Sequence, residues 1–251
     1  MRNLICLLFL FLITWGCDKE EAPECFRSAG EMTTREIQVV TFEELIVFGR
    51  INVFIEQGNN HKVVVRTGKN LIEDITAEVE GKRLVLKNNI SCNFFRDYNI
   101  TEVHITVPNL TVLQNAGPNT IQCTEPLHFP SLWIKAFDQK EVDEIYTNGD
   151  YRLELISEEI RITSDNFSNF YITGKTGYFD VYFAAGNGRL EAAGLEADII
   201  NIQHRGTNTL KINPIEVLKG EIRSTGDVIS VSRPAVVDVE TFYTGDLIFD
   251  L

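Results

Sequence analysis

The sequence predicts an all-β fold and, within that class, a single-chain β-solenoid: a right-handed β-helix with two-cornered rungs of about 20 residues. Three observations lead to this prediction. The chain is a succession of short apolar runs rich in Val, Ile, Phe and Thr, separated by Gly and Asn. Two series of Gly and Pro recur every 19 or 20 residues in its second half. Only residues 70–77 have a helical periodicity.

The composition indicates a folded, acidic chain. Its 251 residues include 36 Asp and Glu against 23 Lys and Arg, a formal net charge of −13. With 44% hydrophobic and 24% charged residues, the chain has the balance of a globular protein of one or two domains. The excess of acid argues against nucleic acid as a partner and against a polybasic membrane-surface module.

The first 16 residues have the pattern of a secretory signal peptide. A short basic start precedes an apolar run at residues 4–14, which is too short for a bilayer span of roughly 20 residues. Gly16 and Cys17 follow, and then four charged residues. This arrangement resembles the lipobox of bacterial lipoproteins, in which the Cys is lipidated. The alternative is an ordinary secreted protein that is cut near Gly16, with Cys17 uninvolved.

From this we expect a lipoprotein signal peptide at residues 1–16 and a lipidated tether at residues 17–30. The charged residues after Cys17 also resemble the export tags of surface lipoproteins in the Bacteroidetes, although a plain flexible tether fits them too. The expected location is the outer membrane, with the protein exposed at the cell surface or facing the periplasm. The membrane is then a partner through the N-terminal lipid.

The cysteines predict one disulfide. Cys6 leaves with the signal peptide and Cys17 carries lipid, so Cys25, Cys92 and Cys123 remain in an oxidising compartment. Cys123 has the parity of a core-facing strand residue, whereas Cys25 and Cys92 lie in polar segments. Elimination therefore predicts a Cys25–Cys92 disulfide, which would close a loop of about 67 residues and contribute about 4 kcal/mol. The spacing of Cys and His shows no metal-binding pattern.

The first half of the body contains strand-like runs, in order. A single segment at residues 70–77 interrupts them with one or two predicted helical turns. One face of this segment carries Leu71, Ile72 and Ile75, and Asn70 could cap it. The predicted strands lie at residues 37–40, 45–48, 51–55, 62–65, 83–87 and 103–107.

The second half is a repeat with two opposed corners per rung. Glycine suits such corners because tight bends often need a positive φ, and because rungs about 4.8 Å apart leave little room for a Cβ. The alternative is a β-sandwich with chance glycine spacing. One series of corners is Gly186, Gly206, Gly226 and Gly245, and the second is Gly174, Gly194, Pro214 and Pro234.

Residues 48–58, 63–71 and 79–84 resemble the signature of the head GIN domain family, as do the cysteine segments at 25–30 and 92–98. Arg50 departs from the family's contiguous Gly-Ile-Asn. The resemblance implies envelope proteins of Bacteroidetes with a β-helical fold and a role in adhesion. It divides the body into a head GIN segment at 31–115 and a β-solenoid repeat segment at 116–251.

Catalytic motifs are missing from the sequence: it has no nucleophile elbow, zinc-protease motif or phosphate-binding loop, and its four histidines are scattered. We therefore expect no enzyme activity, no metal and no cofactor. Asp227 and Asp246 each follow a corner glycine one rung apart. They are candidates for a ligand or Ca²⁺ site, or for a pair of glycosidase acids. Ordinary turn chemistry is the favoured interpretation of both.

Surface aromatic residues suggest a strip on which carbohydrate could stack. Alternation along the strands sends part of the group inward, and core packing is the favoured interpretation. Trp133, between Leu132 and Ile134, is interpreted in the same way. The group consists of Phe167, Phe170, Tyr171, Phe179, Tyr182 and Phe183.

The leading functional hypothesis is a non-enzymatic adhesion or ligand-binding module that faces a glycan or a surface protein. One alternative is a polysaccharide-active enzyme of the β-helix type, a lyase or hydrolase. Another is an envelope scaffold or stress sensor, which would expose an apolar patch. The open end of a solenoid is a strand edge, so homo-oligomer contacts or a cap are expected near residues 249–251.

Overall fold

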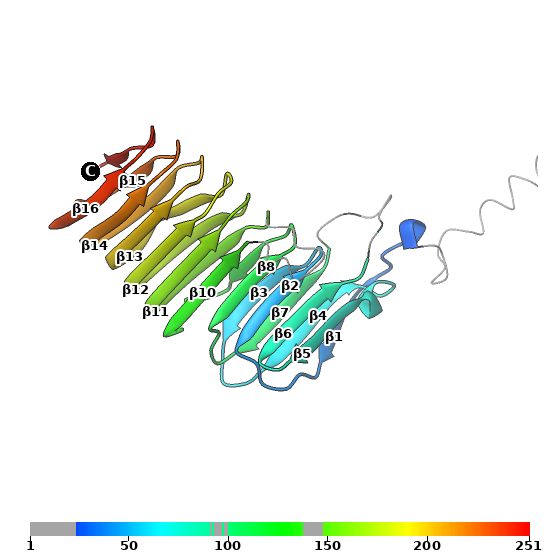
Figure 1. Ribbon diagram of the computed structural model, residues 1–251. Coiled ribbons are helices and arrows are strands. Elements are labelled where there is room, and N and C mark those ends of the chain that lie inside the picture. The colour runs from blue at the N-terminus through cyan, green and yellow to red at the C-terminus, as the bar shows by residue number, and fades with distance from the viewer. Residues whose placement is uncertain (1–23, 91, 93–96, 98–99, 138–147) are drawn as a thin grey trace, which may run out of the picture.

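The computed structural model describes residues 24–90, 92, 97, 100–137 and 148–251 (Figure 1). The predicted signal peptide and Cys17 lie outside these residues. Within them the fold is all-β, as the sequence predicts: a mixed sheet of 17 strands with two short 3₁₀ helices, η1 (Glu24–Phe26) and η2 (Ile72–Asp74). The strands are β1 (Met32–Ile37), β2 (Glu44–Phe48), β3 (Asn52–Gln57), β4 (Lys62–Gly68), β5 (Ile75–Glu80), β6 (Arg83–Asn88), β7 (Glu102–Val107), β8 (Val112–Ala116), β9 (Ile121–Cys123), β10 (Ser131–Ala136), β11 (Tyr151–Ser164), β12 (Asn169–Phe183), β13 (Arg189–His204), β14 (Leu210–Ile222), β15 (Val228–Ser230), β16 (Val236–Thr241) and β17 (Leu247–Phe249).

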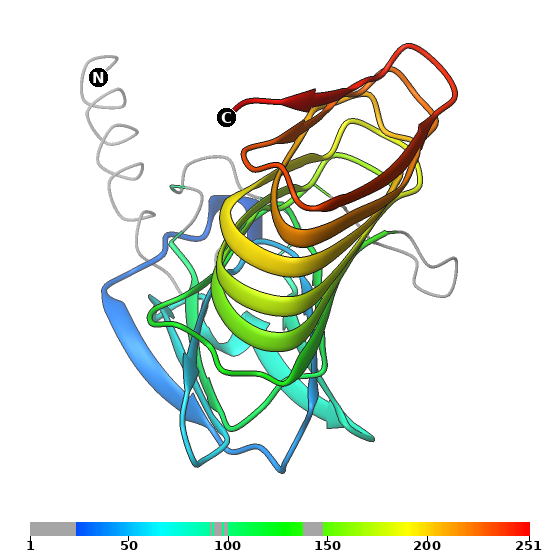
Figure 2. The same cartoon turned by 90° about the vertical axis from the view of Figure 1, so that its left-hand side faces the viewer.

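The four longest strands, β11 to β14, stack in parallel in chain order. Ile162 of β11 pairs with Val181 of β12, and Leu190 of β13 pairs with Leu210 of β14. The predicted period of about 20 residues is thus the register of this parallel pairing. Figure 2 shows these strands from the end of the stack, each one bending as it passes around the interior. The hand of the winding stays a prediction.

Each long strand contributes to two faces of the molecule. Alternate residues point inward along the strand, and at a bend the inward positions change from one alternate set to the other. Along β11, Tyr151 and Leu155 are buried, and beyond the bend Ile160 and Ile162 are buried. Residues before the bend have odd numbers and those after it even numbers. The switch turns both halves of the strand toward the same interior.

We call the two sides face A and face B. Face A runs β1–β4–β7–β3–β9, then the first halves of β11 to β14, then β15 and β17. Face B runs β5–β6–β2–β8–β10, then the second halves of β11 to β14, then β16. Strands β1, β4 and β5 are antiparallel to their neighbours, and the remaining pairings are parallel. Near the N-terminus, β2 and β3 lie between later strands, so the spatial order there differs from the chain order.

A single apolar core lies between the faces and extends from Phe42 to Val228. Tyr151 is its largest fully buried side chain. The Tyr151 hydroxyl donates to the backbone carbonyl of Lys135 (2.5 Å) and accepts from the backbone N–H of Asn115 (2.7 Å). Burial raises the pKa of this phenol well above its ordinary value. The hydroxyl therefore ties β11 to β8 and β10 as a neutral group.

The corner glycines are required for two different reasons. Gly186 has a positive φ of 81°, which disfavours other residues. At Gly226 and Gly245 the constraint is the close stacking of corners, since a Cβ would collide with the carbonyl oxygen of Asn208 or of Gly226, respectively. The backbone N–H of Gly226 donates to the Gly206 carbonyl at 3.3 Å, which joins successive corners directly.

Two local predictions were wrong. The strand predicted at residues 37–40 is β1, Met32–Ile37, which pairs with β4. The one or two helical turns predicted within 70–77 are present as the single 3₁₀ turn η2, and the chain from Ile75 joins the edge of β6 as β5. Asn70 is not a helix cap; its side-chain amide donates to the Ser28 carbonyl at 3.1 Å.

Candidate functional site

The cysteine prediction is confirmed by a Cys25–Cys92 disulfide. The segment that follows Cys25 packs against η2 and the residues just before it. Arg27 forms an ion pair with Asp74 (2.5 Å), and the Ala29 carbonyl accepts from the Asn70 N–H (3.1 Å). Cys123 is a free thiol that packs against the core while remaining half-buried. Burial raises the pKa of this thiol, so it is a poor nucleophile.

Asp227 and Asp246 are brought together by the stacking of successive corners, and the contact between them runs from a carboxylate to the backbone of the next corner. Oδ1 of Asp227 accepts a hydrogen bond of 2.9 Å from the backbone N–H of Asp246. The two carbonyls continue the stack, since Asp227 O accepts from Leu210 N and Asp246 O accepts from Val228 N, both at 2.9 Å. In the part of the chain that the structure describes, no group of three or more His, Cys, Asp or Glu could hold a metal ion.

The aromatic group divides by parity. Phe170, Phe179 and Phe183 are fully buried in the core. Tyr171 and Tyr182 lie on outer surfaces, the first on face A and the second on face B. Phe167, at a corner, is 59% exposed. The core interpretation is correct for three rings, and the rings that remain outside belong to different faces.

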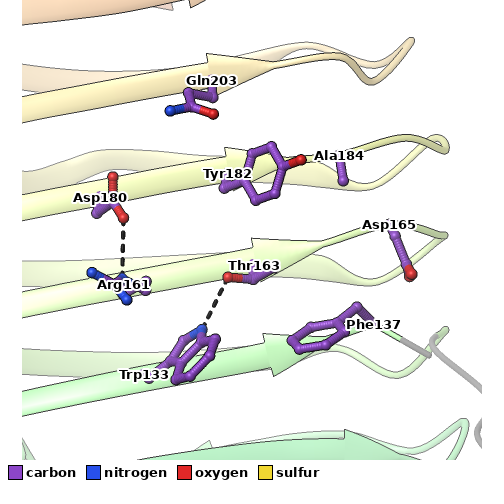
Figure 3. A pocket seen from close by; sticks show the side chains of 9 residues that line it. All are labelled: Trp133, Phe137, Arg161, Thr163, Asp165, Asp180, Tyr182, Ala184 and Gln203. Carbon is purple, nitrogen blue, oxygen red and sulfur yellow. Dashed lines mark hydrogen bonds and ion pairs between the residues drawn. The ribbon is translucent and has the colours of Figure 1, made fainter. Parts of the chain in front are cut away.

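Trp133 points outward, so its assignment to the core was wrong. It lies on β10 between buried Leu132 and Ile134, and its alternation with them places the indole on the outer surface of face B. There it contributes to an open groove of about 510 Å³ that crosses strands β10 to β13 (Figure 3). A groove of this volume can hold a small ligand. Its lining residues are Trp133, Phe137, Arg161, Thr163, Asp165, Asp180, Tyr182, Ala184 and Gln203.

The Trp133 ring is held by polar and cationic neighbours. Its indole N–H donates to Oγ1 of Thr163 at 2.9 Å (Figure 3). The Lys135 ammonium lies 3.8 Å from the indole centroid, on a side chain that is only 7% exposed. Burial, together with the charge of Arg83, lowers the pKa of Lys135, and Glu44 opposes this shift. The ring is thus part of a cation–π contact beside the groove.

Polar side chains in the groove are paired with one another. Arg161 on β11 contacts Asp180 on β12 at 3.1 Å (Figure 3), and the side-chain amide of Asn201 donates to the same carboxylate at 2.8 Å. The lining therefore contains one ion pair, Arg161 with Asp180, and a second carboxylate, that of Asp165. Aromatic rings next to neutralised polar groups suit a ligand with many hydroxyls and no net charge.

The fold and the groove define an all-β protein with a parallel strand stack and an outward-facing groove. A family model, described as "Putative auto-transporter adhesin, head GIN domain", matches residues 41–234. The chain belongs to this family.

Solved structures with the same fold come from the Bacteroidetes. A putative adhesin from Bacteroides fragilis has a TM-score of 0.76 at 16% identity, over 88% of this chain and 99% of that one. Two proteins from Parabacteroides distasonis, a putative lipid binding protein and a putative adhesin, each have a TM-score of 0.63 at 16% identity. Both matches cover 88% of this chain, and 98% and 99% of theirs, respectively. No curated protein matches.

No helix in the described residues is long and apolar enough to cross a membrane.

The sequence contained a signal for the groove in the position of Trp133. A residue between two core residues on a strand must face the opposite side, and Trp133 lies directly between Leu132 and Ile134. Arg161, Asp180 and Gln203 carried no comparable signal. The register of four parallel strands brings Arg161 and Asp180 into the row of Trp133, and Gln203 into the neighbouring row of Lys135.

Proposed function

We propose that the protein is a cell-envelope lipoprotein that acts as a non-enzymatic adhesion module, and that its outer groove binds a neutral glycan. In this proposal the body is a right-handed β-solenoid, and lipid on Cys17 attaches it to the outer membrane. The observation that carries the proposal is the groove across β10 to β13, where Trp133 and Tyr182 lie beside Arg161, Asp180 and Gln203. Family membership supports the adhesive role.

Binding suits this groove better than catalysis. An acid–base pair needs a carboxyl group that exchanges protons near neutral pH. Asp180 is instead occupied by Arg161 and Asn201, and Asp227 accepts a backbone hydrogen bond. These contacts hold each carboxylate in place. They are contacts of a rigid recognition surface, which supports the adhesion hypothesis over the polysaccharide-active enzyme.

The test is a glycan array that carries neutral and acidic oligosaccharides, probed with the full-length protein. Release of sugar products is measured in parallel. The expected result is saturable binding of neutral glycans without product release, lost in Trp133→Ala and Tyr182→Ala. Tyr171→Ala is the matched control because it removes an outer-surface ring from face A. Binding that survives both groove substitutions would contradict the proposal, as would product release.

A second probe separates glycan from lipid. One neighbouring structure carries the name of a lipid-binding protein, so phospholipid vesicles are tested beside the array. The groove lining is rich in charged and hydroxyl groups, and this predicts no binding to vesicles that depends on Trp133. Vesicle binding that is lost in Trp133→Ala would show that the groove binds a lipid instead of a glycan.

A further inference from the structure

The stack ends at its C-terminus in an open strand edge. Strand β16 pairs with β14, and β17 pairs with β15, each on one side only within the described chain. The N–H of Phe242 donates to Ile222 and that of Asp250 donates to Ser230, both at 2.9 Å. Because backbone groups alternate between the two sides of a strand, those of Val237 and Val239 point away from the stack. We call residues 236–251 the terminal edge.

The terminal edge leaves the apolar interior uncovered. Val237 continues the inward row of Leu218, yet it is 41% exposed while Leu218 is buried. Terminal rungs of stacked repeats normally have a polar cap, and open strand edges are normally blocked or paired. Large exposed apolar side chains gather here: Val236, Val237, Phe242, Tyr243, Ile248 and Leu251.

The outer surface of this edge is acidic. On β16 the outward positions include Asp238 and Glu240, which lie beside Lys219 and Glu221 of β14 in the parallel register. Earlier in the same outward row, Arg161 pairs with Asp180 across neighbouring strands. A strand added next to β16 would complete this pattern if it placed basic residues opposite the two acids.

A second copy of the chain does not supply basic residues opposite Asp238 and Glu240. Antiparallel pairing of two β16 strands centred on Val239 places Asp238 opposite Glu240. Pairing of β16 with β17 of another copy brings Asp246 or Asp250 opposite the same acids. Head-to-tail stacking of two copies places β5 of one copy beside β16 of the other. Glu78 and Glu80 are outward positions of β5, since they lie opposite Val85 and Arg83 of β6. Each arrangement opposes like charges, which destabilises a strand pair.

We propose that the terminal edge binds an extended segment of another protein, in which Lys or Arg alternates with apolar residues. The segment adds as one more strand beside β16. Its backbone hydrogen-bonds to Val237 and Val239, its apolar side chains cover the open interior, and its basic side chains meet Asp238 and Glu240. Strand addition of this kind takes its affinity from main-chain hydrogen bonds and its selectivity from alternate side chains.

The test uses the full chain and three short synthetic peptides, at physiological salt. The first alternates Val with Lys, the second alternates Val with Glu, and the third has the composition of the first with its lysines in one block. The expected result is one-to-one binding of the alternating Lys peptide, about tenfold tighter than either of the others. Equal binding of the blocked Lys peptide would reduce the effect to net charge and overturn the proposal.

Two variants locate the contact. Val239→Pro removes an N–H that points away from β14, so the stack should keep its melting temperature while peptide binding falls about tenfold. The double variant Asp238→Lys with Glu240→Lys should reverse the preference toward the Glu peptide. Trp133→Ala should bind the Lys peptide unchanged. Unaltered binding in Val239→Pro would overturn the proposal.

Sedimentation of the same samples tests whether a second copy of the chain occupies the terminal edge. The full chain should show no dimer that depends on the terminal edge. A dimer that is abolished by Val239→Pro would assign the edge to self-association instead of to a foreign strand.

Discussion

The indole N–H of Trp133 donates a hydrogen bond of 2.9 Å to Oγ1 of Thr163 on the neighbouring strand. The register pairs Trp133 with Arg161 and Lys135 with Thr163, so this bond runs diagonally between two outward rows of face B. Together with the Lys135 ammonium, which lies 3.8 Å from the ring centroid, it fixes the orientation of the indole. The ring is therefore preorganised at the groove before any ligand arrives.

Truncation of this ring should abolish most ligand binding. Trp133→Ala removes an aromatic anchor, a loss that at binding surfaces costs about 2 kcal/mol or more, or roughly 30-fold in affinity. The measurement is a titration with the strongest glycan from the array. Tyr171→Ala, with its ring stacked near Arg152 on face A, should leave the affinity unchanged. A similar loss in both variants would show that the groove is not the site.

The positioning role of Thr163 is tested by Thr163→Val, which keeps the shape and removes the acceptor. A hydrogen bond of this kind has a net value of about 1 kcal/mol, so the affinity should fall about fivefold. Thr163→Ser keeps the hydroxyl and should restore binding. If the Val and Ser variants bind equally well, the indole contact has no influence on affinity.

The buried hydroxyl of Tyr151 predicts a large effect on stability. Tyr151→Phe leaves the Asn115 N–H and the Lys135 carbonyl without this partner inside the core. The free energy of unfolding should drop by about 1 to 3 kcal/mol, measured by urea denaturation. Tyr171→Phe removes a more exposed hydroxyl and should change stability by less than about 0.5 kcal/mol.

His204 should make stability depend on pH. Its ring is fully buried against Phe183, and Nε2 lies 2.9 Å from the carbonyl of Asn208. Burial lowers its pKa below the ordinary 6.5, although Asn208 and Asp227 act in the opposite direction. The unfolded chain therefore binds a proton at a higher pH than the folded chain does. Stability should be constant above about pH 6.5 in this respect and fall as the pH drops below it.

The measurement compares urea unfolding of the wild type and of His204→Leu between pH 7.5 and pH 5, a range set by the ordinary histidine pKa. Leu is a suitable replacement because Ile222 occupies the same inward position on the next rung. The loss of stability on acidification should be smaller in the variant. Identical slopes in the two proteins would show that His204 is not the cause of the pH dependence.

The disulfide should stabilise the start of the described chain. Replacing both Cys25 and Cys92 with Ala should lower the free energy of unfolding by about 2 to 4 kcal/mol. Hydrogen exchange should accelerate at the Asn70 amide, which donates to Ala29 beside the disulfide segment. Cys123→Ala is the matched control, expected to leave the exchange at Asn70 unaltered. Unchanged exchange in the double variant would mean that the segment is held without the disulfide.

The class of fold was accessible from the sequence because it depends on local patterns. Period-two alternation defines strands such as β3 and β7, and the spacing of Gly186, Gly206 and Gly226 matches the register of the first halves of β12 to β14. After the bends the register shifts, and Ile199 pairs with Tyr178 and Val217. The position of β2 and β3 between later strands was not accessible, since it depends on pairing between segments far apart in the chain. Tertiary pairing also ends the helical turn predicted within 70–77 at Asp74, because the chain from Ile75 joins β6 as β5.

The candidate site was less accessible for the same reason. Parity alone places Trp133 outside, but the groove exists only because Trp133, Asp180 and Gln203 belong to strands that the register stacks side by side. Asp227 and Asp246 did meet, as their one-rung spacing predicts, but the Asp227 carboxylate accepts a hydrogen bond from the backbone N–H of Asp246. A periodic pattern thus predicts which residues are neighbours without saying what chemistry they share.

In the stacked part of the molecule, each of β12 and β13 is bonded only to the strand before it and the strand after it. A duplicated turn of chain inserted between β13 and β14 would pair with the strand before it and the strand after it, as β12 and β13 do. It would move the terminal edge about 4.8 Å further from the groove and leave the residues of both unchanged. The stack is therefore a spacer whose reach can grow or shrink in whole turns, independently of what its two ends hold.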